Sequence, residues 1–234
     1  MTTKDDDDNA IIEDALSKAD SNILPDVIPI FPLSDVLLLP CAKLPLNIFE
    51  PRYLEMVDYA LAHNRLIGII QPRQSGEEKN TEEPDVYDMG CLGRIINFSE
   101  IGDGRYAITL LGLSRFTIQS ELPVSENFRL ANVDYETFIE DLNDSKISVA
   151  QRDDLLKTVR VYLSANEIDA DWETIEDAAD YALITSLSML CPFSAGEKQA
   201  LLECDNILDR THLLSNLMTL SLHDTDAADQ GAIH

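Results

Sequence analysis

The apolar residues follow two different patterns along the chain. Between residues 27 and 138, short apolar runs alternate with polar positions and stop at proline or glycine, which is typical of β-strands. Between residues 139 and 222, apolar residues recur every three or four positions among many carboxylates, which is typical of amphipathic helices. A run of strands followed by a run of helices predicts an α+β protein with segregated halves.

The first half is predicted to be a β-barrel with one early helix. Residues 28–48 contain four prolines, which favour extended backbone, and Pro51 suits the first position of a helix that runs to Leu61. The tripeptide Gly102-Asp103-Gly104 predicts a tight hairpin turn. Further strands are expected at residues 66–71, 90–101, 105–113, 115–121 and 128–138. Six or seven twisted strands tend to close, so we expect a closed or nearly closed antiparallel barrel.

The second half is predicted to be a bundle of helices. Helices are expected over residues 148–165, from Asp171 or Thr174 to Cys191, over residues 197–204 and over residues 206–222. Ser194 lies three residues before Glu197, the spacing of a capping box, and Asp205 is placed to cap the last helix. Residues 1–26 are acidic with few large apolar groups, and residues 223–234 follow the last helix, so both are expected to be flexible tails.

Charge narrows the range of partners. The formal net charge is −26, and such a surface repels nucleic-acid phosphates and anionic membranes. No apolar run is long enough to span a bilayer, and the N-terminus lacks the basic and apolar segments of a signal peptide, so we expect a cytoplasmic protein.

The sequence offers no recognisable catalytic or metal-binding motif. The four cysteines lie far apart without a CxxC pair, so buried reduced thiols are expected, and the four histidines are too scattered for a zinc site. Neither a GxxxxGK[ST] phosphate loop nor a GxSxG nucleophile elbow occurs. The carboxylates cluster on helix faces that we expect to be solvated. We therefore predict a non-enzymatic protein with no metal and no cofactor.

Several spaced motifs point to one known family. They are Phe31-Pro32-Leu33, Pro40, the run LPLNIFEPRY at residues 44–53, Met56, Gly90-Cys91-Leu92-Gly93-Arg94-Ile95 and Gly112-Leu113-Ser114-Arg115-Phe116. In these residues the chain resembles the Lon protease N-terminal (substrate-binding) domain, and especially its stand-alone bacterial relatives. The resemblance covers roughly residues 27–222. It implies a PUA-like antiparallel β pseudo-barrel, residues 27–138, followed by a helical bundle, residues 139–222.

The resemblance also implies a function without catalysis. Full-length Lon proteases carry ATPase and serine–lysine peptidase domains after this region, and we expect neither here, so the label "peptidase" would come only from the family name. The implied role is polypeptide binding, in which unfolded or apolar segments are captured. They would dock in a groove between barrel and bundle, or add a strand at an open sheet edge.

Five residues are candidates for that binding site, and each has two interpretations. Phe49, Arg52 and Tyr53 would form the rim of a groove for extended polypeptide, because aromatic and arginine side chains are common interface anchors. Alternatively, Glu50 and Pro51 simply start the helix and Arg52 pairs with a carboxylate or a carbonyl. Phe31 and Leu33 complete the candidate site, or they belong to the barrel core.

Competing functions remain open at the level of sequence. The main alternative is an adaptor or structural module that docks one folded partner, such as a protease or its regulator. A substrate binder would accept many unfolded peptides, whereas an adaptor would accept one partner. A small-molecule enzyme would need an enclosed polar pocket, for which the sequence shows no constellation. RNA binding, which a PUA-like shape suggests by analogy, is opposed by the charge.

Overall fold

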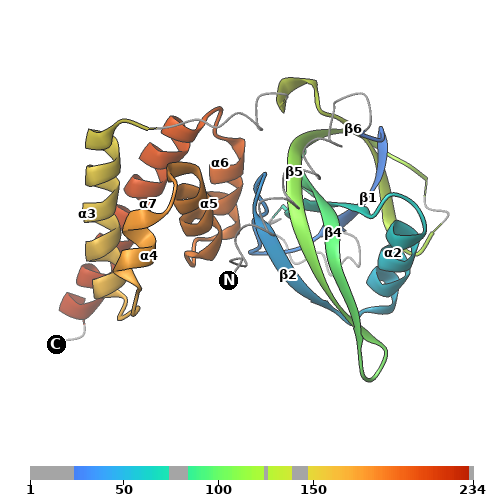
Figure 1. Cartoon of the computed structure of the whole chain (residues 1–234), viewed down its shortest axis with the longest axis horizontal. Coiled ribbons are helices and arrows are strands. Elements are labelled where there is room, and N and C mark those ends of the chain that lie inside the picture. Colours follow the sequence, from blue (N-terminus) through green and yellow to red (C-terminus); the bar gives the residue numbers. More distant parts are fainter. Residues whose placement is uncertain (1–23, 74–83, 124–125, 139–146, 232–234) are drawn as a thin grey trace, which may run out of the picture. The chain divides into compact units, whose positions relative to one another are not determined.

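The structure is a computed structural model that describes residues 24–73, 84–123, 126–138 and 147–231, with residues 223–231 described by their backbone alone. The predicted tail at residues 1–26 lies outside the described residues except for its last three. The chain divides into two compact units, Met1–Asn143 and Asp144–His234. The first carries the strands and the second carries only helices, which confirms the predicted α+β class (Figure 1).

The first unit, hereafter the sheet unit, is a six-stranded sheet that closes on itself. Its strands are β1 (Val27–Pro32), β2 (Lys43–Ile48), β3 (Leu66–Ile70), β4 (Met89–Ile101), β5 (Arg105–Glu121) and β6 (Arg129–Asp134). The order is β2-β5-β4-β3-β1-β6, and an additional pairing between β5 and β6 closes the barrel. The pairing of β1 with β3 is parallel, contrary to the all-antiparallel prediction. The intervening β2 and helix α2 (Pro51–Ala62) form a connection long enough to reverse the chain.

Strand β5 corrects the prediction of two separate strands at residues 105–113 and 115–121. It is continuous over 17 residues and pairs with β2 near its start and β6 near its end. Register shifts along its pairings with β4 and β6 bend the strand without ending it. One long bent strand therefore pairs with β2 on one part of the barrel and with β6 on another.

The core of the sheet unit fills the space that these strands enclose. Ile28 and Ile30 of β1 and Phe116 of β5 are completely buried there. Residues 36–39 form no strand, although Leu37, Leu38 and Leu39 are buried. The hairpin predicted at residues 102–104 joins β4 to β5, and Asp103 and Gly104 both adopt positive φ there.

The second unit, hereafter the helical unit, contains five described helices: α3 (Val149–Ala165), α4 (Trp172–Asp177), α5 (Asp180–Leu190), α6 (Ala195–Glu203) and α7 (Ile207–Gly231). Helix α7 packs against α3, α5 and α6. The predicted capping box is confirmed, since the Ser194 hydroxyl accepts from the Glu197 N–H and the Glu197 carboxylate accepts from the Ser194 N–H. Helix α3 begins at the predicted place, after Ser148.

Three boundaries in the helical unit differ from the prediction. The single helix expected between Asp171 and Cys191 is two helices, because the chain is extended at Ala178 and Ala179. Asn206 rather than Asp205 caps α7, since its side-chain oxygen accepts from the Asp209 N–H at 3.0 Å. Helix α7 also continues past the predicted end at residue 222 to Gly231, so most of the predicted C-terminal tail is helical.

Candidate functional site

A pocket of about 350 Å³ opens in the sheet unit where β1 and β2 end and α2 begins. All five residues that the sequence proposed for polypeptide binding line it. Among the described residues, the lining is Phe31, Pro32, Leu33, Ser34, Asn47, Ile48, Phe49, Glu50, Arg52, Tyr53, Pro72 and Pro84. Residues from four separate segments therefore meet at one concave surface.

Two aromatic rings lie together in the pocket lining. Phe31 is 5% exposed, and its ring centre lies 4.2 Å from that of half-buried Tyr53. Alternation along β1 sends Ile28 and Ile30 into the core, so Phe31 lies on the opposite face, where α2 packs against β1. Burial raises the pKa of Tyr53 although Arg52 opposes the shift, so the phenol stays neutral at physiological pH. This part of the pocket is uncharged and mainly apolar.

The rim is formed where the chain turns from β2 into α2. Phe49 immediately follows β2 and is 65% exposed, although phenylalanine is ordinarily a core residue. Glu50 is extended at φ −73° and ψ 133° in the position before the helix, and Pro51 opens α2 as predicted. This turn places Phe49 outward at the pocket mouth.

Arg52 is fixed by two neighbours at the rim. Its Nε and Nη2 donate to Glu50 Oε2 at 3.1 and 2.8 Å, and its guanidinium lies 4.6 Å from the Tyr53 ring centre. The structural interpretation of Glu50, Pro51 and Arg52 is thus confirmed, and Glu50 and Arg52 also line the pocket. At the mouth the charges of Arg52 and Glu50 therefore offset each other.

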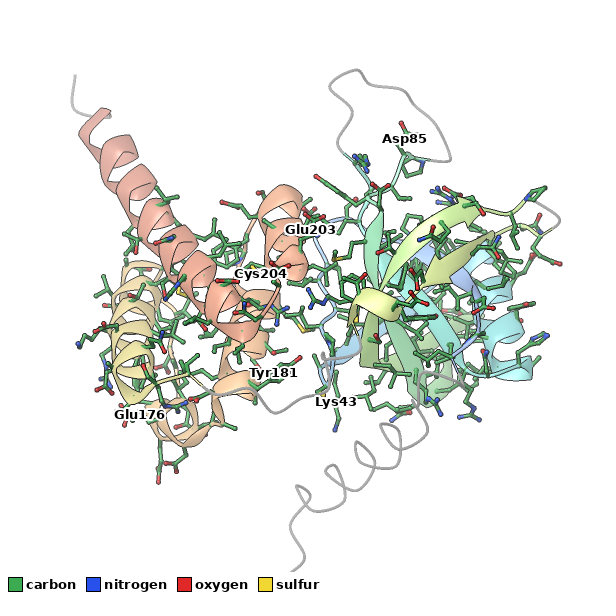
Figure 2. All side chains as sticks on the ribbon, turned by 90° about the horizontal axis from the view of Figure 1, so that it is seen from above. Lys43, Asp85, Glu176, Tyr181, Glu203 and Cys204 are labelled. Atoms are coloured by element: carbon green, nitrogen blue, oxygen red, sulfur yellow. The ribbon has the colours of Figure 1, made fainter. Side chains whose placement is uncertain are left out.

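The far wall comes from segments that sequence reasoning did not assign to the site. Pro72 follows β3, and Pro84 lies before β4 in the predicted loop. The two segments pair through Arg73 N–H to Asp85 O at 2.7 Å, and Asp85 is labelled in Figure 2. Arg129 Nη1 of β6 donates to Pro84 O at 2.8 Å and so fixes this wall to the barrel. No local signal linked residues 72, 84 and 129.

The described lining of the pocket is mainly apolar. It contains no histidine or cysteine, and its one carboxylate, Glu50, is paired with Arg52. Within the described part of the chain, no three potential metal ligands come together. In the same part of the chain, no helix is both long and apolar enough to cross a membrane. An apolar cavity with aromatic walls and a paired rim charge fits an apolar group attached to a larger ligand.

The four cysteines agree only in part with the prediction of buried reduced thiols. All four lie in the described part of the chain, and none forms a disulfide. Cys91 and Cys191 are buried as predicted, whereas Cys41 and Cys204 are only half-buried. None of the four lines the pocket.

A closed sheet with an apolar pocket at one corner forms the first unit, and a helical unit follows it in the chain. Comparison with known proteins identifies the family that has this arrangement. The chain belongs to the ATP-dependent protease La (LON) substrate-binding domain family, whose model matches residues 27–219. This confirms the family resemblance found in the sequence.

Individual relatives agree with the family. Lon protease 2 of Sorangium cellulosum (strain So ce56) is 26% identical over 197 residues, which cover 81% of this chain and 24% of that protein. Lon protease of Desulfosudis oleivorans (strain DSM 6200 / JCM 39069 / Hxd3) is 36% identical over 93 residues, which cover 39% of this chain and 11% of that protein. The chain thus matches a quarter or less of the length of these relatives.

Solved structures show the same fold. A Lon N-terminal domain protein from Xanthomonas campestris superposes with a TM-score of 0.58 at 23% identity, covering 80% of this chain and 96% of that chain. The N-terminal domain of a Mycobacterium avium complex Lon protease gives a TM-score of 0.60 at 17% identity, covering 82% of this chain and 98% of that chain.

Proposed function

We propose that this protein recognises polypeptide substrates by seating apolar side chains of unfolded segments in the pocket at Phe49. The family description supports substrate recognition as the general role. The observation that carries the proposal is the 65% exposure of Phe49 at the mouth of a pocket walled by Phe31 and Tyr53. The ATP-dependent proteolysis of the longer relatives is not part of this proposal.

The geometry favours unfolded clients over folded ones. The pocket volume of about 350 Å³ lies near the lower end for ligand sites, so it takes an apolar side chain and not a folded surface. Burial of one large apolar side chain contributes roughly 1.5–3 kcal/mol. An affinity from so few anchors is weak, on the order of micromolar, unless several segments of one client bind in turn.

Charge adds a preference among clients. The net charge of −26 attracts basic segments, repels acidic ones and leaves neutral ones unaffected. At the mouth itself Arg52 and Glu50 neutralise each other, so the preference comes from the wider surface. Added salt is therefore expected to slow association with basic clients while the apolar contact persists.

The test is a titration of the protein into a fluorescent, permanently unfolded polypeptide and into its folded counterpart, followed by anisotropy at low and moderate salt. We expect saturable binding to the unfolded form alone. Phe49→Ala should weaken that binding at least tenfold, because an aromatic anchor in a pocket behaves as a hot spot. Leu190→Ala is the matched control, since Leu190 is 81% exposed at the end of α5 and should be neutral.

Other outcomes would decide against the proposal. If the protein binds neither form, or if Phe49→Ala binds the unfolded form as the wild type does, the pocket is not the polypeptide-binding site. Selective capture of one folded partner by the wild-type protein would instead support the adaptor alternative.

A further inference from the structure

Strand β2 has a strand partner along only one side. Among the described residues, β1, β3, β4, β5 and β6 each pair with at least two strands, whereas β2 pairs with β5 alone. Closure of the barrel through β5 and β6 leaves β2 outside the closed ring. No described strand pairs with the outer side of residues 44–48, so an extended polypeptide can pair with the backbone donors and acceptors there.

The side chains of β2 indicate what would complete this edge. Leu44 and Leu46 are half-buried, although their cross-strand partners Leu110 and Ile108 are fully buried. Opposed residues share a sheet face, so the burial of this face stops at β2. A further strand with apolar residues at alternate positions would cover Leu44 and Leu46 in the way that β2 covers Ile108 and Leu110.

We propose that an extended client segment adds to the outer edge of β2 as a further strand and continues into the pocket at Phe49. The inference rests on the proposed function and specifies the bound conformation and sequence pattern of the client. The edge of β2 is continuous with the pocket, because Asn47 and Ile48 at the end of β2 also line the pocket. This continuity supports the proposal. The client is a segment of about six residues, apolar at every second position, not acidic, and without proline where it must donate to β2.

A second open stretch of the sheet is less suitable. Among the described residues, residues 97–101 of β4 extend beyond the pairing with β3 and pair with β5 alone. Charge at an edge disfavours strand addition, and Glu100 lies within this open stretch, whereas the one charged residue of β2, Lys43, lies at its first position. The edge of β2 (it begins at Lys43, labelled in Figure 2) carries no carboxylate. Pro45 removes one N–H from β2, which limits the pairing and favours reversible binding.

Charge argues against a second copy of this chain as the occupant. Two copies joined edge to edge through β2 would bring together two molecules of net charge −26. A neutral or basic client segment meets no such repulsion. The edge is therefore assigned to a client and not to self-association.

The decisive experiment changes the client backbone and leaves its side chains intact. In a peptide that binds in the anisotropy assay, single amide-to-ester replacements would be moved along the six-residue core. Strand addition predicts losses of roughly three- to tenfold at every second position and little change between them, since alternate N–H groups face β2. Leu46→Lys should also weaken binding, whereas Ser99→Lys on the β4 edge is the matched control and should not.

The outcomes separate this inference from the proposed function. If ester replacement has no periodic effect while Phe49→Ala still weakens binding, the pocket acts alone and strand addition is wrong. If no unfolded peptide binds, the proposed function fails and the strand addition fails with it. A dimer in sedimentation that Leu46→Lys dissociates would assign the edge to a second copy and overturn the proposal. Because the ester series is made in the client, it remains decisive even if Leu46→Lys impairs folding.

Discussion

Exposed apolar side chains at the helix ends of the helical unit have different surroundings from Phe49 of the sheet unit. In the helical unit, Leu190 is the last residue of α5 and Val149 is the first of α3, so both extend from helix ends. In the sheet unit, Phe49 stands at the mouth of a pocket that brings together residues 31–34, 47–50, 52, 53, 72 and 84. A single exposed apolar residue needs no functional explanation. The same exposure at the mouth of an apolar pocket is what supports Phe49 as part of the proposed binding site.

The units also differ in what fixes their shape. The helical unit depends on local caps, such as Ser148 with Gln151 and Ser194 with Glu197. The sheet unit depends on close contacts between segments that are distant in sequence. Gly112 shows this most clearly, because its N–H donates to Ala42 O and its carbonyl accepts from Cys41 N–H. Substitutions in the sheet unit should therefore have larger consequences.

The largest effect is expected from Gly112→Ala. A Cβ at this position would lie 2.1 Å from Leu39 O, a backbone atom that cannot move without displacing residues 39–42. We expect a loss of more than about 3 kcal/mol in the free energy of unfolding, on the scale of overpacking with backbone displacement. Chemical denaturation followed by circular dichroism measures this loss.

Gly196→Ala provides the matched change in the helical unit. A Cβ there meets nothing within 4 Å, and the residue lies in the first turn of α6. Because alanine has the higher helix propensity, stability should rise by a few tenths of a kcal/mol to about 1 kcal/mol. Equal destabilisation by both substitutions would contradict the contrast between local and long-range constraints.

A smaller effect is expected from two arginines that perform the same structural task in the two units. Arg129 joins Glu121 and the Pro84 carbonyl, whereas Arg152 joins Asp180 and the carbonyls of Glu176 and Ala178. Replacement of either by methionine keeps the aliphatic stem and removes the charged donors. Each should lower the free energy of unfolding by about 1–2 kcal/mol, because a half-buried charged donor loses its hydrogen bonds.

Client binding should distinguish these two arginines. Pro84 forms part of the pocket wall, so Arg129→Met should weaken binding of the unfolded polypeptide several-fold. Arg152→Met should leave that affinity unchanged in the anisotropy assay at a temperature where both variants are folded. If both variants bind as the wild type does, the Pro84 wall makes no contribution to recognition.

Much of this architecture was predictable because local chemistry determined it. Pro51 opens α2, the Ser194 capping box opens α6, and the turn at residues 102–104 forms the hairpin, each from interactions within a few residues. The continuous β5 was not predictable, because pairing with β2, β4 and β6 holds the strand across Gly112 and Ser114. The parallel pairing of β1 with β3 was likewise not predictable, because it depends on the tertiary arrangement of the strands.

The candidate site likewise contains residues that local sequence brings together and residues that only the folded barrel brings together. Residues 31–33 and 49–53 belong to one motif-rich stretch, so their gathering in one pocket followed from a short connection. Pro72, Pro84 and Arg129 come from three distant segments that meet only through the closed barrel. The split of the helix at Ala178 and Ala179 has a similar origin, since Arg152 of α3 binds the carbonyls that the split leaves unpaired.

The last predicted effect is comparable with that of Gly196→Ala and concerns the helical unit at alkaline pH. Burial raises the pKa of the Cys191 thiol from 9.0 to about 11, although Lys198 opposes the shift. The folded thiol therefore keeps its proton where the unfolded thiol loses it. The stabilisation is complete below pH 9 and is lost as pH rises toward 11. Between pH 8 and 10 this difference should lower the free energy of unfolding by about 1 kcal/mol.

Denaturation of the wild type and Cys191→Ala at pH 8 and 10 isolates this contribution. The alanine variant starts from a lower stability because of the lost packing, but it should lack the additional alkaline decrease. Burial also raises the pKa of Tyr135 in the sheet unit, and keeping the pH at or below 10 limits that second contribution. An identical pH dependence in both proteins would show that Cys191 ionises in the folded state as readily as in the unfolded chain. The alkaline loss would then belong to other groups, and the helical unit would lack the tightly packed thiol that distinguishes its core from the accessible pocket of the sheet unit.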